Sequence, residues 1–476
     1  MDENLGKFID NFASLVEIAQ AGRHRVSSGT QLLTTLTDHL AVQAETVAVV
    51  VEEIPPHRFV DADILMAELT AADPHFRLVG IGGGDQRHHQ SLSDMVQQSQ
   101  LFPHFPLSQP DYTNLAVGPD EQRQAVALGL WLFRHEGSPL AVLQRDANPR
   151  YGRQAASLEV LAAGTGKAAR FLSEFRRRMQ NFSVLKGQVL SLVMGEYGPS
   201  SAGVTFHARP ALAASDVILP DGLLEKVSDH VLGIAEHRDT LTSYGQHLKR
   251  GVLLYGSPGT GKTHTVRYLL SRSEGATAIL LSGGSLARIS EAATMARALQ
   301  PSIVVLEDCD LIAEDRSFGH GPQPLLFEVL DAMDGLASDA DVAFVLTTNR
   351  VDMLERALAQ RPGRVDLAVE IPLPAQAERV SLLQLYARGI SFSAGSIEDA
   401  AARTEGTTAS FTRELVRRAV VAAALDGATV ADHHLATAVD DLMADSAALT
   451  RSLLGSGAGS GPGGPFPGAP QAFDAV

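Results

Sequence analysis

The sequence predicts an α/β protein with a central parallel sheet, preceded by an α+β domain and followed by a small helical domain. Three observations predict this class. Short apolar runs alternate with helical patterns from about residue 217 to 374, the apolar period is almost purely helical from 375 to about 454, and Gly, Pro, Ser and Ala dominate from 455 onward. Alternation of this kind is typical of a parallel sheet with helices on both faces, and a segment without a core-forming pattern is expected to be disordered.

These observations predict four segments. They are an N-terminal α+β domain at 1–205, an α/β core at 210–374, a helical domain at 375–454 and a disordered Gly/Pro-rich tail at 455–476. In the first segment, period and turn residues predict helices at 5–19 and 155–179 and strands at 46–52, 76–81, 125–134, 140–144 and 204–206. The core should contain strands at 252–254, 278–281, 303–306, 343–347 and 367–371. The helical domain should contain helices at 375–386, 396–403, 410–425 and 431–453.

Composition excludes several classes of protein. The 476 residues carry a formal net charge of −16 without a long Lys/Arg run, which disfavours a nucleic-acid partner. The longest apolar stretches fall far short of the ~20 residues that a membrane helix needs, so we expect no membrane segment. Cys309 is the single cysteine, which rules out an internal disulfide and fits a reducing compartment. With no basic-then-apolar segment at its start, the chain is expected to be cytoplasmic.

A phosphate-binding loop is the strongest motif in the chain. It matches the pattern G-x-x-x-x-G-K-[ST] in full, between an expected strand and an expected helix, at Gly256, Ser257, Pro258, Gly259, Thr260, Gly261, Lys262 and Thr263. Glycines let the backbone turn its N–H groups towards phosphate oxygens, and the following helix N-terminus favours negative charge. Lys262 should neutralise the β- and γ-phosphates, and the Thr263 hydroxyl should bind Mg²⁺. The motif predicts ATP and Mg²⁺ as cofactors.

Two carboxylates follow a buried apolar strand at 303–306. A strand beside the phosphate-loop strand is expected to carry such acids to the metal and the attacking water. Glu307 should orient the ligands of the Mg²⁺ and so share the metal with Thr263, whereas Asp308 should polarise the water. The order Glu-Asp is the reverse of the usual pair, and it sets the shorter Asp308 about one methylene further from the water.

Two features that look like a phosphate loop or a metal site are interpreted as structural. Residues 164–167, Gly-Thr-Gly-Lys, have Leu161 where the loop pattern needs glycine and Ala168 where it needs Ser or Thr. The glycines at 82–84 lack the lysine of the pattern, and the adjacent His88 and His89 are a poor pair for one metal.

With these motifs in order, residues 217–446 resemble the AAA family of AAA+ ATPases. Asn349, in the segment 346–350, is similar to the polar residue of the family's sensor-1 strand, which helps to place the water. Arg361 and Arg364, in 357–366, match the two arginine-finger positions, which act in the neighbouring subunit's site. The resemblance implies a P-loop NTPase core with an AAA+ lid and a hexameric ring, expected to be a homo-oligomer. Arg413 lies two positions from the sensor-2 place and is interpreted as structural.

Within the family, the ATPase module is similar to the mitochondrial Rieske-protein translocase and to the AAA metalloprotease. The zinc motif H-E-x-x-H does not occur, so no protease domain is expected. The stretch 282–289 has no aromatic residue where unfoldases present a pore loop, which leaves polypeptide threading open. The leading hypothesis is a ring-forming, protein-remodelling or chaperone-like ATPase with an unknown client. The alternative is a low-turnover, nucleotide-controlled scaffold, and a nucleic-acid translocase is disfavoured by charge.

Overall fold

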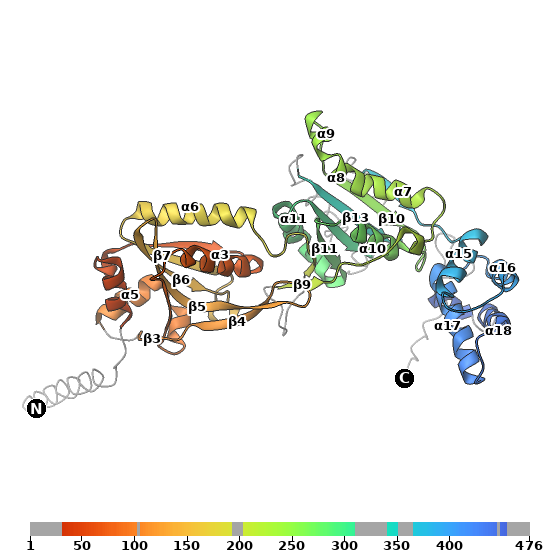
Figure 1. The fold of residues 1–476 in the computed structure, drawn as a ribbon, viewed down its shortest axis with the longest axis horizontal. Coiled ribbons are helices and arrows are strands. Elements are labelled where there is room, and N and C mark those ends of the chain that lie inside the picture. Colours follow the sequence, from red (N-terminus) through yellow and green to blue (C-terminus); the bar gives the residue numbers. More distant parts are fainter. Residues whose placement is uncertain are drawn as a thin grey trace, which may run out of the picture. The chain divides into compact units, whose positions relative to one another are not determined.

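The computed structural model describes residues 31–101, 105–192, 203–309, 340–350, 365–444 and 448–454. These residues form two compact units, one from the described parts of 31–186 with 203–207, and the other from 187–192 with the described parts of 208–454. Figure 1 shows their helices and strands. The α/β class is confirmed, because residues of the central segment form a parallel sheet packed with helices. The expected helix at 5–19 and the tail at 455–476 lie outside the described residues.

The first unit contains an antiparallel sheet with the strand order β1-β7-β6-β5-β2-β3, in which β4 also pairs with β5. Its strands are β1 (Val49–Ile54), β2 (Arg77–Ile81), β3 (Leu107–Ser108), β4 (Asp111–Ala116), β5 (Gln122–His135), β6 (Ser138–Arg145) and β7 (Ala156–Ala162). Its helices are α2 (Leu32–Leu40), α3 (Phe59–Ala71), α4 (Gln86–His89), α5 (Leu92–Leu101) and α6 (Thr165–Asn181), with short 3₁₀ turns at Ala44–Thr46, Pro56–Arg58 and Pro149–Tyr151.

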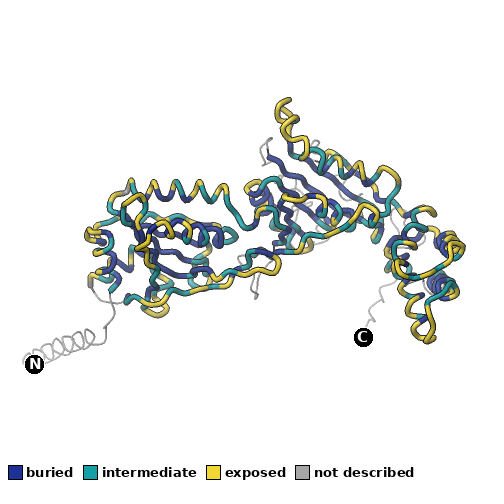
Figure 2. Tube along the Cα trace, viewed as in Figure 1, coloured by how far each residue is buried: buried dark blue, intermediate teal, exposed yellow. Residues whose placement is uncertain are grey.

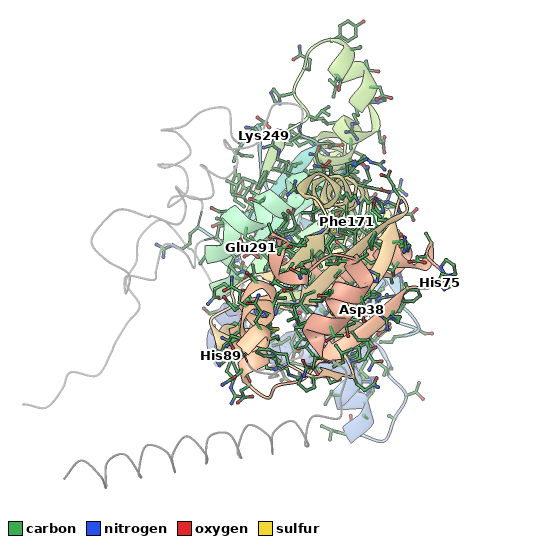
Figure 3. All side chains as sticks on the ribbon, turned by 90° about the vertical axis from the view of Figure 1, so that its left-hand side faces the viewer. Asp38, His75, His89, Phe171, Lys249 and Glu291 are labelled. Carbon is green, nitrogen blue, oxygen red and sulfur yellow. The ribbon has the colours of Figure 1, made fainter. Side chains whose placement is uncertain are left out.

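Helices cover both faces of this sheet. Successive strand residues point to opposite faces, so Val142 of β6 packs with α3 and α6, whereas its neighbour Leu143 packs with α2 and α5. Phe171 of α6, labelled in Figure 3, is fully buried in the first of these cores. Figure 2 shows the same layering, with buried strands and helices whose outer sides are exposed. Because both of their faces are buried, the central strands consist of continuous runs of mainly apolar residues.

One expected element in this unit is wrong. A helix was predicted over 155–179, but β7 occupies Ala156–Ala162 and α6 begins only at Thr165. Every residue of β7 is buried, with Leu158 and Leu161 in different cores, so the run contains no solvent-facing position that would reveal its period. The hairpin between β5 and β6 is present, and Glu136 and Gly137 at its turn both adopt positive φ, 48° and 73°, as a tight two-residue hairpin requires.

The second sheet has the strand order β14-β10-β13-β12-β11-β8-β9, and the pairs β14-β10, β10-β13, β13-β12, β12-β11 and β11-β8 are parallel. Its strands are β8 (Val189–Leu192), β9 (Val204–His207), β10 (Arg250–Tyr255), β11 (Thr277–Ser282), β12 (Ser302–Glu307), β13 (Val342–Thr348) and β14 (Leu367–Glu370). The accompanying helices are α7 (Leu223–Ser228), a π-helical turn at Asp229–Gly233, α8 (Ile234–Glu236), α9 (Arg238–Ser243), α10 (Lys262–Arg272) and α11 (Ile289–Ala298), with 3₁₀ turns at Ala214–Asp216 and Gly283–Arg288.

A small helical bundle follows the second sheet. It contains α15 (Gln376–Tyr386), α16 (Ala394–Arg403), α17 (Ala409–Leu425), α18 (Asp432–Met443) and α19 (Ala448–Leu453) around an apolar core that includes Leu383, Phe411, Leu415 and Leu435. The single helix predicted over 431–453 is wrong, because Ala444 leaves the helical conformation with ψ 147° and ends α18. We call α15–α19 the lid bundle.

Candidate functional site

The carboxyl ends of three neighbouring strands meet at one edge of the second sheet. Parallel pairing aligns Tyr255 of β10 with Thr348 of β13, and Leu306 of β12 with Leu346 of β13. The expectation that the acidic strand lies beside the phosphate-loop strand is wrong, because β13 lies between β10 and β12. Since all three strands run in the same direction, the phosphate loop, the acids at the end of β12 and Asn349 after β13 still gather at this edge.

The phosphate loop joins β10 to α10, as the motif requires. Gly256, its first residue, has φ 147°, and a Cβ at this position would overlap the backbone oxygen of Ile371. Ile371 also donates its N–H to Tyr255 O at 2.7 Å, so the end of the β14 strand is held directly against the loop. Glycine is therefore required at 256 by both backbone conformation and space.

Lys262 is the first residue of α10, and its side chain folds back over the loop. Its Nζ donates to Gly256 O at 2.8 Å and to Ser257 O at 2.9 Å, and the residue is 6% exposed. The Thr260 hydroxyl also donates to Ser257 O, at 3.0 Å. A buried ammonium held by loop carbonyls places positive charge at the centre of the loop, where it suits a polyphosphate.

The Thr263 hydroxyl and the Glu307 carboxylate lie in hydrogen-bond contact. The pKa of Glu307 is raised overall. Burial raises it, the hydrogen bond from Thr263 opposes that effect, and the negative charge of Asp308 raises it further. A hydroxyl and a carboxylate on adjoining elements fit a Mg²⁺ ion, which usually takes one or two protein oxygens and completes its shell with phosphate and water. Among the described residues there is no group of three His, Cys, Asp or Glu that could hold a metal ion.

Asp308 adopts the left-handed conformation, with φ 54°. Its N–H donates to Thr347 Oγ1 at 3.0 Å, and its Oδ1 accepts from Asn349 Nδ2 at 3.3 Å. Cys309, which follows, is buried and donates its N–H to Thr347 O at 2.9 Å. β13 thus holds the Asp308 backbone and side chain from the neighbouring strand, which fixes the direction of its carboxylate.

The lid bundle contacts the site at two places. Ser410, in the first turn of α17, donates its N–H to Gly259 O at 3.1 Å. Arg388, after α15, pairs with Asp216 at 2.8 Å, and the Asp216 carbonyl lies 2.9 Å from His264 Nε2 of α10. Hydrogen bonds from the Ala213 N–H and from Arg388 lower the pKa of Asp216, so its carboxylate stays ionised.

Sequence reasoning missed several of these residues. Thr347 could have been suspected, because a polar residue at the end of an otherwise apolar strand is unusual. Ser410 and Arg388 carry no local signal, since their contacts arise from packing of the lid bundle. Arg361 and Arg364, the predicted arginine fingers, lie outside the described residues. Arg413 is exposed on α17, and the stretch 282–289 forms the end of β11, a 3₁₀ turn and the first residue of α11.

No helix in the described parts of the chain is long and apolar enough to cross a bilayer.

Comparison with known proteins supports the interpretation of the site geometry. Residues 252–373 match the family model of the ATPase family associated with various cellular activities (AAA). This range begins in β10 and ends after β14, so it spans the phosphate loop, the acidic pair and Asn349.

Curated relatives match longer stretches of the chain than the family model does. The ATP-dependent zinc metalloprotease FtsH 2 of Sphaerobacter thermophilus is 31% identical over 357 residues, which cover 70% of this chain and 52% of that protein. The 26S protease regulatory subunit 6A of Caenorhabditis elegans is 27% identical over 42% of this chain and 49% of its own. The 26S proteasome regulatory subunit 8 of Dictyostelium discoideum is 34% identical over 34% of this chain and 43% of its own.

The chain spans about half the length of the curated relatives that it matches. The phosphate loop at the head of α10, the acidic pair at the end of β12 and the polar end of β13 all lie inside the range of the family model. The chain therefore carries an AAA-family ATPase domain and is homologous to FtsH and to the proteasome regulatory subunits.

Proposed function

We propose that this chain binds ATP with Mg²⁺ and hydrolyses it, and that it does so as a ring-forming, protein-remodelling ATPase. The observation that carries the proposal is the convergence at one sheet edge of Lys262, the Thr263–Glu307 pair and the Asp308–Asn349 pair. Together they supply a cation, a metal-binding pair and a directed carboxylate, which are the parts that phosphoryl transfer to water needs.

Each group has a distinct proposed role. When bound, the nucleotide would supply the phosphoanhydride bond that is broken, and its metal would neutralise charge on the phosphate oxygens. Lys262 neutralises phosphate charge from the centre of the loop, and Thr263 and Glu307 hold the metal. Asp308 accepts a proton from the attacking water, and Asn349 keeps the Asp308 carboxylate in place through its 3.3 Å hydrogen bond.

Assembly of the subunits into a ring is the second part of this proposal. Arg361 and Arg364 would complete the site of the neighbouring subunit, which requires subunits to adjoin. We propose a homo-hexamer whose N-terminal α+β domain, 1–205, selects the client. A protein client is supported by the relatives, a metalloprotease and proteasome regulatory subunits. Light scattering should show ATP-dependent hexamers, and the variant Arg364→Ala should assemble without hydrolysing; a monomer under all nucleotide conditions contradicts the ring.

A second function is favoured by Asp308. A nucleotide-controlled scaffold would bind ATP, assemble and turn over little, because an aspartate reaches less far towards the water than a glutamate would. The absence of an aromatic residue in 282–289 also separates this chain from unfoldases that thread polypeptide.

The deciding experiment is steady-state ATP hydrolysis by the full chain, with nucleotide binding measured in parallel and Lys262→Ala as the control. Turnover that vanishes in the variant supports the ATPase. Binding without turnover above that of the variant supports the scaffold. If the wild type binds nucleotide no better than Lys262→Ala, both proposals fail.

A further inference from the structure

The first turn of α17 is in direct contact with the phosphate loop. The Ser410 N–H donates to the Gly259 carbonyl at 3.1 Å, and Gly259 adopts φ 79°. A Cβ built on Gly259 would lie 2.8 Å from Ser410 Oγ and 3.2 Å from Thr408 Oγ1, so the loop and the helix are packed without a gap. The position of α17 therefore bears directly on the conformation of the phosphate loop.

Thr408 sets where that first turn begins. It is the N-cap of α17, fully buried, and its Oγ1 accepts a hydrogen bond from the Phe411 N–H at 3.2 Å. The same hydroxyl donates to the carbonyl of Leu454 at 2.6 Å. One hydroxyl has one hydrogen and two lone pairs, so it makes both bonds at once. Thr408 thereby joins the start of α17 to a residue 46 positions later in the chain.

Leu454 directly follows α19, the C-terminal helix of the lid bundle. Arg451 of α19 donates to Leu442 O at 2.8 Å and also bonds Ala444 O, so α19 is held against the end of α18. A continuous series of hydrogen bonds thus runs from α18 and α19 through Leu454 and Thr408 to the first turn of α17. From there the Ser410 N–H carries it to the phosphate loop.

We propose that Thr408 is a positioning residue for the phosphate loop, and that the C-terminal helix α19 acts through it to set nucleotide affinity. The inference rests on the proposed function, since it concerns the same nucleotide site. Without the Thr408 hydroxyl, the first turn of α17 loses its cap and its link to Leu454. The Ser410–Gly259 contact then loosens, and the loop N–H groups that face the phosphates lose their order.

Two variants of Thr408 test the role of the hydroxyl. Thr408→Val removes both hydrogen bonds at nearly constant volume, whereas Thr408→Ser keeps them. The matched control is Thr407→Val, because Thr407 is also buried but its hydroxyl donates to Thr404 O, at 2.7 Å, just after α16. A merely structural role would lower the melting temperature of both valine variants alike and leave nucleotide affinity unchanged.

The measurement is the binding of ADP and of a non-hydrolysable ATP analogue to the full chain by calorimetry. Thr408→Val should bind about fivefold more weakly, the equivalent of losing a typical N-cap, while Thr408→Ser and Thr407→Val bind as the wild type does. Equal affinities for Thr408→Val and Thr407→Val would overturn the proposal.

Truncation supplies an independent test. A chain that lacks residues 445–476 loses α19 and should bind nucleotide as weakly as Thr408→Val, and combining the two changes should weaken binding no further. A chain that lacks only 455–476 keeps Leu454 and should bind normally. Additive losses, or normal binding without α19, would overturn the inference. If the wild type and Lys262→Ala bind equally, the proposed function itself fails and this inference fails with it.

Discussion

Lengthening the acid at position 308 tests whether the site is built for aspartate. In Asp308→Glu the carboxylate would gain a methylene at a residue whose φ is 54°. The left-handed region costs an ordinary L-residue about 1–2 kcal/mol, and Asp is one of the few that tolerates it through local hydrogen bonds. The longer side chain also moves its oxygens away from Asn349 Nδ2, which now lies 3.3 Å from Oδ1.

The two effects add in the same direction. Together we expect a loss of about 1–2 kcal/mol of transition-state stabilisation, which lowers kcat about five- to thirtyfold. Nucleotide affinity should change little, because Asp308 lies beyond the residues that hold the phosphates. The assay is ATP turnover at saturating ATP, with Asp308→Asn as the variant that keeps the backbone preference and removes the charge.

The result that would refute this reasoning is a faster Asp308→Glu. A gain in turnover would mean that reach towards the water limits the rate and that the left-handed backbone adapts freely. The low-turnover scaffold would then be better supported than the remodelling ATPase as the function of this chain.

Three further predictions concern the frame of the site and the first unit. Gly256→Ala should abolish nucleotide binding in a folded chain, measured by calorimetry and circular dichroism, because its Cβ meets the Ile371 carbonyl. Asp341→Ala should lower the unfolding free energy in urea by about 3 kcal/mol, since it leaves the buried Arg250 without its carboxylate partner, which now lies 2.8 Å from Arg250 Nη1; a change below 1 kcal/mol contradicts this. Burial raises the pKa of Asp146 to about 6, above its ordinary 3.8, so its contribution to stability falls as pH rises from about 4 to 6. Asp146→Asn should therefore stabilise the chain by about 2–3 kcal/mol at pH 7.5 and hardly at pH 4, and equal melting shifts at both pH values would refute the assignment.

The sequence predicted the parallel sheet and the phosphate loop well, because both have local signals. Gly256 and Lys262 belong to a motif whose spacing follows from the geometry of a strand, a turn and a helix. The stretch at 156–162 was misjudged because both faces of β7 are buried, including its polar residues Ser157 and Glu159, so no exposed position marks its period.

Other features have no local signal at all. The place of β13 between β10 and β12 depends on how distant strands pair, which residue types near the motif do not encode. The left-handed Asp308 is held by Thr347 from another strand, and Ser410 reaches Gly259 only once the lid bundle has packed. These contacts join residues 39 or more positions apart, so they follow from tertiary structure alone.

The covered sheet of the first unit limits how a partner can be recognised there. Among the described residues, helices α3 and α6 pack on one face of the central strands and α2 and α5 on the other, so the broad faces of β5, β6 and β7 are largely covered. Within the described residues, the surface of this unit consists of the outer sides of those helices, the connecting loops and the edge strands, among them β1, where Val51 is 54% exposed, and β4, where Tyr112 is 48% exposed. Such positions can be exchanged without disturbing either core, so specificity in this unit is free to diverge while its architecture stays the same.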